Sequence, residues 1–180
     1  MSSRYLITEI AAMVLEAGHD YSQYCEGIPA EKFFHQPPGK WSPAMQTRHL
    51  FRSTNMARLG FTLPKFMVRW IGGRPNRASR TYEELVNRYQ QKLQQGGRAS
   101  GRYIPPPIPE SYGQIRLLQE FDSAMKKFAA AIAGTKKEEQ LDQYLAPHPL
   151  LGKITLRELA YFTIHHARHH QQSIAAMLPS

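Results

Sequence analysis

The sequence contains a single cysteine, Cys25, and no long apolar run. One cysteine cannot form an internal disulfide, and its position in an apolar helical pattern favours a small buried residue over a nucleophile. We therefore expect a reducing, cytoplasmic setting. No segment reaches the roughly 20 apolar residues that cross a bilayer, and the N-terminal stretch carries Glu9, Glu16 and Asp20, so we expect neither a membrane anchor nor a signal peptide.

Acidic residues are also few. The chain has 14 Asp and Glu against 23 Lys and Arg, a net charge of +9, and the segment 65–102 alone carries nine basic and two acidic residues. Such a segment can bind nucleic acid, an anionic membrane surface or an acidic substrate, or it can form a solvated face. The length of 180 residues suits one domain with a substantial core, which we assign to residues 1–180.

Helical periodicity dominates the chain, and a convincing alternation typical of strands is missing. We predict four long helices, over residues 3–26, over 43–59, from Ser111 to Gly134, and from Thr155 onward. Polar caps mark three of the starts: Ser42 with Pro43, Ser111 with Gln114, and Thr155 with Glu158. The third helix has the clearest core-facing stripe, with Leu118, Phe121, Met125, Phe128 and Ile132. This pattern predicts an all-α four-helix bundle without strands.

The segment between the second and third long helices is a basic insert. Its loop signals are GFTLP, IGGRPN and GGRASGRYIPPPIP, and they surround one short helix. Thr81 and Glu84 form a capping box for this helix, which we expect to end near Gly96.

Four of the eight histidines lie within the stretch HHARHHQQ, residues 165–172. At 100° per residue, His166 and His170 fall on the arc of the last helix that faces the core. His165 and His169 fall on a more polar arc. The pair predicted to point inward is therefore His166 and His170.

A spacing of four residues places two imidazoles one helical turn apart, where both can reach one metal ion. The second helix offers a third inward histidine, His49, which shares its face with Met45 and Ser53. Three neutral nitrogen donors suit zinc, nickel or another late divalent metal and leave a coordination position open for water or substrate. Spacing alone also allows a solvated histidine tract, and His49 alone can be a hydrogen-bonded core residue.

Other patterns are weaker. Glu16 and His19 have the Glu-x-x-His spacing of a di-iron bundle, but a second copy is missing, and no HExxH motif occurs. His35 and His148 lie close to prolines, which predicts loops. No carboxylate stands out as a general base, because capping explains Glu158.

Two motifs stand out in the chain: GKWSPAMQTRHL at residues 39–50 and HPLLGKITLRELAYFTIHHARHHQQSI at residues 148–174. Together they resemble the DinB-like (YfiT-like) superfamily, whose members include metal-dependent enzymes. The resemblance implies a divalent metal bound by His49, His166 and His170. It also implies a class of reaction, since the family includes thiol S-transferases that use bacillithiol or mycothiol, and maleylpyruvate isomerases.

We accordingly expect a metal-dependent enzyme, with zinc or nickel as cofactor and a small-molecule substrate. The lack of an obvious base favours thiol transfer over hydrolysis, and arginines of the insert would hold an anionic cosubstrate. The alternative is a non-enzymatic module whose insert binds nucleic acid or an acidic partner, although we expect no nucleic acid and no membrane partner. An apolar strip within residues 66–71 forms either a homodimer interface or part of the monomer's core.

Overall fold

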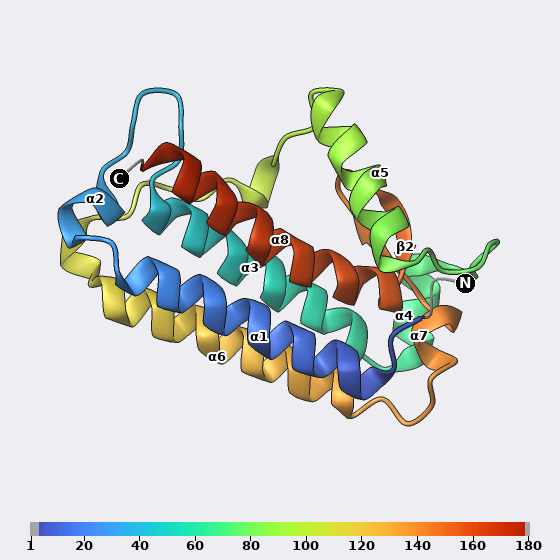
Figure 1. The fold of residues 1–180 in the computed structure, drawn as a ribbon. Coiled ribbons are helices and arrows are strands. Elements are labelled where there is room, and N and C mark those ends of the chain that lie inside the picture. Colours follow the sequence, from blue (N-terminus) through green and yellow to red (C-terminus); the bar gives the residue numbers. More distant parts are fainter. Residues whose placement is uncertain (1–3, 179–180) are drawn as a thin grey trace.

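Four long helices lie side by side in the computed structural model of the protein, which describes residues 4–178 (Figure 1). They are α1 (Ile7–Glu26), α3 (Pro43–Thr62), α6 (Gln114–Ala133) and α8 (Leu156–Met177). α1 and α8 run in one direction and α3 and α6 in the other, so α1 is antiparallel to its neighbour α6, and α3 is antiparallel to its neighbour α8. The prediction of an all-α helical bundle is confirmed. No helix in this described range is both long and apolar enough to cross a membrane.

The buried core follows the helical stripes of the sequence. The predicted stripe of α6 is buried along its whole length. α6 packs closely against α1 at Gly18, where an added Cβ would lie 3.0 Å from the side chain of Met125. Cys25 is buried, as predicted, and burial raises the pKa of its thiol to about 12, which disfavours the reactive thiolate.

Two of the three polar caps predicted for the long helices are confirmed, and so is the capping box of Thr81 and Glu84 in the insert. Ser42 Oγ accepts a hydrogen bond from the Met45 N–H at 3.1 Å, and Thr155 and Glu158 form a reciprocal capping box. The predicted Ser111 cap is wrong, because Ser111 lies in the 3-10 turn η2 (Glu110–Tyr112) and Gly113 precedes α6. The Gln114 side chain instead donates to the carbonyls at the end of α1 and just beyond it.

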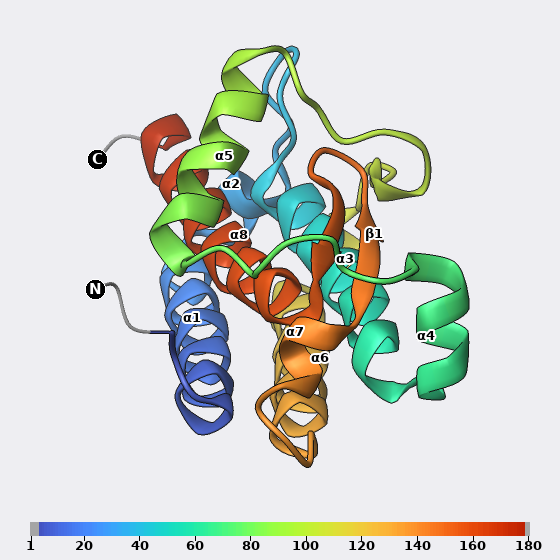
Figure 2. The ribbon, with the colours of Figure 1, turned by 90° about the vertical axis from the view of Figure 1, so that its right-hand side faces the viewer.

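Shorter elements connect the long helices: α2 (Ala30–Phe34), α4 (Lys65–Gly72), α5 (Tyr82–Gln94), η1 (Gly101–Tyr103) and α7 (Gln140–Gln143). The insert between α3 and α6 therefore holds two helices, and the prediction of one is wrong. Prolines and glycines on both sides of α4 suggested irregular chain, although its eight residues suffice for two turns. Figure 2 shows α5 across α8 and α4 beside the hairpin described next.

A two-stranded antiparallel hairpin precedes α8, so the prediction of no strands is wrong. It consists of β1 (Leu145–His148) and β2 (Gly152–Thr155), with Leu145 opposite Thr155. Strands of four residues are too short to show a clear alternation. Pro147 also argued against a strand, but a two-stranded sheet has only edges, where a missing N–H is tolerated.

α4 ends in direct contact with this hairpin. A Cβ at Gly72 would lie 1.9 Å from the carbonyl oxygen of Leu145, so no side chain fits without moving the backbone. We expect Gly72→Ala to lower the free energy of unfolding by about 1–3 kcal/mol through overpacking. Urea denaturation measures this, with Gly134→Ala as control, because that Cβ meets nothing closer than 3.4 Å. Equal stability of the two variants would contradict the contact.

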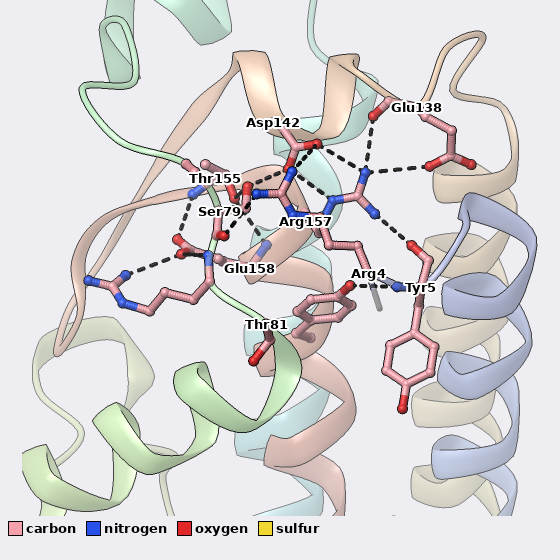
Figure 3. A network of polar contacts seen from close by, with 12 residues as sticks. Arg4, Tyr5, Ser79, Thr81, Glu138, Asp142, Thr155, Arg157 and Glu158 are labelled. Atoms are coloured by element: carbon pink, nitrogen blue, oxygen red, sulfur yellow. Dashed lines mark hydrogen bonds and ion pairs between the residues drawn. The ribbon is translucent and has the colours of Figure 1, made fainter. Parts of the chain in front are cut away.

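Two charged networks fix the start of α8 (Figure 3). In the first, the buried Arg157 guanidinium donates to Asp142 of α7 at 2.9 and 3.1 Å, to the Tyr5 carbonyl at 2.6 Å and to Glu138. Ser79 of the insert also donates to Asp142. Arg157 thereby ties the chain before α1 and the α6–α7 connection to α8, and Asp142 adds the insert through Ser79.

In the second network, the fully buried Glu158 carboxylate accepts two hydrogen bonds from Arg77, at 2.6 and 2.9 Å. It also accepts from the Arg80 N–H at 2.8 Å and from the Arg80 guanidinium at 3.2 Å. Burial alone would raise the pKa of Glu158, but these hydrogen bonds and the charge of Arg77 hold it below its usual value. Capping is therefore only one of its roles.

Candidate metal centre

The structure brings together the three histidines singled out in the sequence. His49 projects from α3, and His166 and His170 project from successive turns of α8; all three are buried. His166 Nε2 lies 3.1 Å from His49 Nε2 and 3.1 Å from His170 Nε2. Within residues 4–178, these three form the one cluster of His, Cys, Asp or Glu side chains whose ligand atoms all lie within 4.8 Å of one another.

Hydrogen bonds orient two of the rings. His49 Nδ1 lies 2.7 Å from the Tyr103 carbonyl oxygen, which can only accept, so Nδ1 carries the proton. His170 Nδ1 lies 2.8 Å from Gln46 Oε1, and the amide of Gln46 is oriented by its own donation to the Trp41 carbonyl. The Nε2 atoms of His49 and His170 therefore present lone pairs to the centre of the cluster.

This arrangement fits a metal ion. The two lone pairs face His166 Nε2, which can supply at most one proton between them. A cation at the centre satisfies all three nitrogens, and imidazole nitrogens are the donors that zinc and nickel accept. The cluster could thus hold a metal, while the identity of the metal stays a prediction.

Burial keeps the three rings neutral. It lowers the pKa of His49, and it lowers the pKa of His166 and His170 further, with a smaller contribution from their mutual repulsion. A neutral imidazole has the free lone pair that binds a metal. The site is therefore in its binding form at neutral pH.

The sequence analysis missed the two groups that orient the rings. Gln46 precedes His49 by three residues, so its position one turn away on α3 was an available signal. Tyr103 contributes a main-chain carbonyl from η1, and such a contact leaves no signal in residue types. Partners of this kind fix the tautomer of a ligating histidine.

We expect Gln46→Ala to weaken metal binding roughly 10- to 100-fold, because His170 loses the acceptor that fixes its ring. Titration against a chelator of known affinity measures the change. Gln172→Ala is the matched control, since this exposed glutamine lies on α8 away from the cluster. Unchanged metal affinity in Gln46→Ala would show that the His170 ring does not need the hydrogen bond to Gln46 in order to bind metal.

The other histidines differ from expectation in two places. His165 and His169 were predicted on a polar arc, but they are half-buried because α5 covers them, with the Tyr89 ring centre 5.8 and 5.9 Å from theirs. His148, predicted in a loop, ends β1 and packs on Phe162 at 4.2 Å. Burial lowers its pKa to about 4. His35 lies exposed just after α2, as expected.

The histidine cluster forms part of the wall of a cavity of about 1150 Å³. Residues of α3, α4, α5, the hairpin and α8 surround it, together with the α2–α3 loop and the chain around η1. Its volume exceeds the range of roughly 300–1,000 Å³ that is usual for small-molecule sites. A ligand of substantial size therefore fits beside the three imidazoles.

The fold and the cluster together define a helical-bundle protein with a three-histidine centre between its second and last long helices. Residues 14–174 match the model of the DinB superfamily, and the chain belongs to this superfamily. Comparison with curated proteins and with solved structures gave no match.

Proposed function

We propose that this protein is a metal-dependent enzyme that binds zinc or nickel through His49, His166 and His170 and acts on a small molecule held in the adjoining cavity. The observation that carries the proposal is the convergence of three Nε2 atoms on the wall of that cavity. Ligand sites typically combine such an apolar hollow with a few convergent polar groups.

We propose thiol transfer as the reaction. A bound divalent ion would supply Lewis acidity that lowers the pKa of a thiol. Three neutral imidazoles leave the charge of such an ion uncancelled, which favours an anionic ligand such as a thiolate. The thiol proton leaves to solvent, the sulfur forms a bond to an electrophilic carbon, and the leaving group departs with its electron pair.

The remaining side chains of the cavity favour thiol transfer over hydrolysis. Among the described residues that line the cavity, none is an Asp or Glu, so no carboxylate base faces it. His148 and His169 also line it. The Nδ1 of His148 accepts the N–H groups of Leu150 and Leu151, so its other nitrogen holds the proton, and His169 is the one remaining candidate base among these described lining residues. Attack by a thiolate needs no base, whereas activation of water usually does.

The test is a turnover assay with low-molecular-weight thiols and carbon electrophiles, run with zinc- and nickel-loaded protein. We expect thiol consumption that requires metal and disappears in His49→Ala. Hydrolysis of esters and amides is measured in parallel. Metal-dependent hydrolysis without thiol transfer would assign the site to a hydrolase, and loaded protein without either activity would refute the enzyme proposal.

The alternative function, a nucleic-acid or acidic-partner module, has less support. The basic residues of segment 65–102 do not form one free surface, because Arg77 and Arg80 are engaged by Glu158 and two others lie over the Tyr144 ring. Binding to nucleic acid that weakens steeply with salt, without turnover, would favour this alternative.

A homodimer through α4 also stays a proposal. Phe66 and Trp70 are 75% and 87% exposed, whereas Val68 is buried. Met67 and Ile71 are exposed as well, so the alternative that the strip is buried in the monomer is wrong for every member except Val68. Light scattering gives the molar mass, and Trp70→Glu should convert such a dimer to a monomer.

A further inference from the structure

The charge of the cavity has one sign. Three cationic residues line it: Lys40 from the α2–α3 loop, Arg98 from the chain after α5, and Arg102 from η1. No carboxylate is found among its described lining residues, and most of the others are apolar.

These three cations are available to a ligand. All three are exposed, and within residues 4–178 no carboxylate forms an ion pair with any of them. Arg77 differs, since Glu158 holds it in place. A lining cation without an internal partner is free to pair with a bound anion.

The cavity is elongated along α3, and its two ends differ. Along α3 and its C-cap the lining extends from Gln46 to Leu63, which corresponds to about 25 Å along the helix axis. Arg102 lies beside the first half of α3, because its carbonyl is 3.5 Å from the Arg52 guanidinium and the next carbonyl, that of Tyr103, accepts from His49.

The opposite end is apolar. The last turn of α3 contributes Leu59, the C-cap of α3 contributes Leu63, and α4 contributes Val68 and Ile71. The histidines and Arg102 therefore lie toward one end of an elongated cavity whose other end favours apolar groups.

We propose that the ligand of this cavity is an anionic amphiphile: one carboxylate- or phosphate-type group held near the histidines by Lys40, Arg98 and Arg102, and an apolar chain or ring system directed along α3 toward α4. This inference rests on the proposed function, since it names the class of substrate that the metal centre would meet. The anionic group secures orientation, and the apolar body supplies most of the affinity.

Calorimetric titration with three probes tests the proposal: decanoate, its neutral analogue decanamide, and butanoate. The full chain is used both zinc-loaded and metal-free. Each methylene buried adds up to about fourfold in affinity, so decanoate should bind at least about 100-fold more tightly than butanoate. Pairing with three cations should favour decanoate over decanamide by roughly tenfold.

Two sets of variants assign these differences to residues. Combined Lys40→Gln, Arg98→Gln and Arg102→Gln should abolish the preference for decanoate over decanamide, whereas Arg88→Gln, an exposed cation outside the cavity, should keep it. Ile71→Asn should reduce the advantage of the long chain. Trp70→Asn is its control, since Trp70 is adjacent and exposed but does not line the cavity.

The outcomes separate this inference from the metal proposal. Equal binding of decanoate and decanamide would overturn the inference. A preference for decanoate that survives in the triple variant but vanishes when the metal is removed would also overturn it, because the metal ion alone would then hold the anion. A preference for decanoate that persists in metal-free protein and is lost in the triple variant supports anion binding by Lys40, Arg98 and Arg102, even if the protein proves to bind no metal.

Discussion

Replacing His49, His166 or His170 by alanine should remove bound metal, whereas replacing His165 or His169 should leave it in place. Each of the first three supplies one of the converging Nε2 atoms, and two remaining imidazoles hold a divalent ion weakly. The loss should exceed the roughly 10- to 100-fold weakening typical of losing an outer hydrogen-bond partner. Mass-spectrometric metal analysis of tag-free protein, reconstituted with zinc, nickel or manganese, measures the stoichiometry.

The control pair is well matched, because His165 and His169 lie on the same helix, next in sequence to the two predicted ligands and half-buried against α5. Metal that persists in all three single variants would show that the ion binds elsewhere. Native protein that takes up none of the three metals would refute the metal centre itself, because its three imidazole rings are already neutral and oriented for binding.

The helical parts of this structure could be predicted because their signals are local. The stripe of α6 and the faces of α8 repeat every three or four residues, so the inward direction of His166 and His170 follows from the sequence of one helix. His49 required only the same argument on α3.

What the sequence could not reveal depends on contacts between distant segments. Arg77 meets Glu158 across 81 residues, and the Tyr103 carbonyl meets His49 across 54. A local pattern records neither contact. Half-burial of His165 likewise depends on where α5 comes to lie, which the amphipathic pattern of α8 alone does not contain.

The largest loss of stability should follow Glu158→Gln. Its carboxylate is fully buried between the start of α8 and the insert, and glutamine keeps the capping geometry but not the charge. Removing one partner of a buried ion pair usually costs roughly 3–5 kcal/mol, and the partial exposure of Arg77 and Arg80 places this case at about 3 kcal/mol. Urea denaturation monitored by circular dichroism gives the free energy of unfolding.

Glu84→Gln is the matched control. Glu84 occupies the same position in the capping box of α5, with its side chain accepting from the Thr81 N–H at 2.8 Å, but it is exposed. A change there should cost less than about 1 kcal/mol. If the two substitutions lower the free energy of unfolding equally, helix capping alone would account for the contribution of Glu158 to stability. The charge of Glu158 would then not hold the insert in place.

Acidification should remove the contribution of the Glu158 charge to stability without any mutation. The folded pKa of Glu158 lies below the usual value of 4.5, so the unfolded state binds more protons as the pH falls and the folded state loses relative stability. This contribution is complete above about pH 4.5 and decreases as the pH falls through the lower folded pKa. The difference in Tm between the native protein and Glu158→Gln should therefore be constant near neutral pH and shrink toward pH 3. A difference that stays constant over this range would mean that Glu158 stabilises the fold through contacts that do not depend on its ionisation.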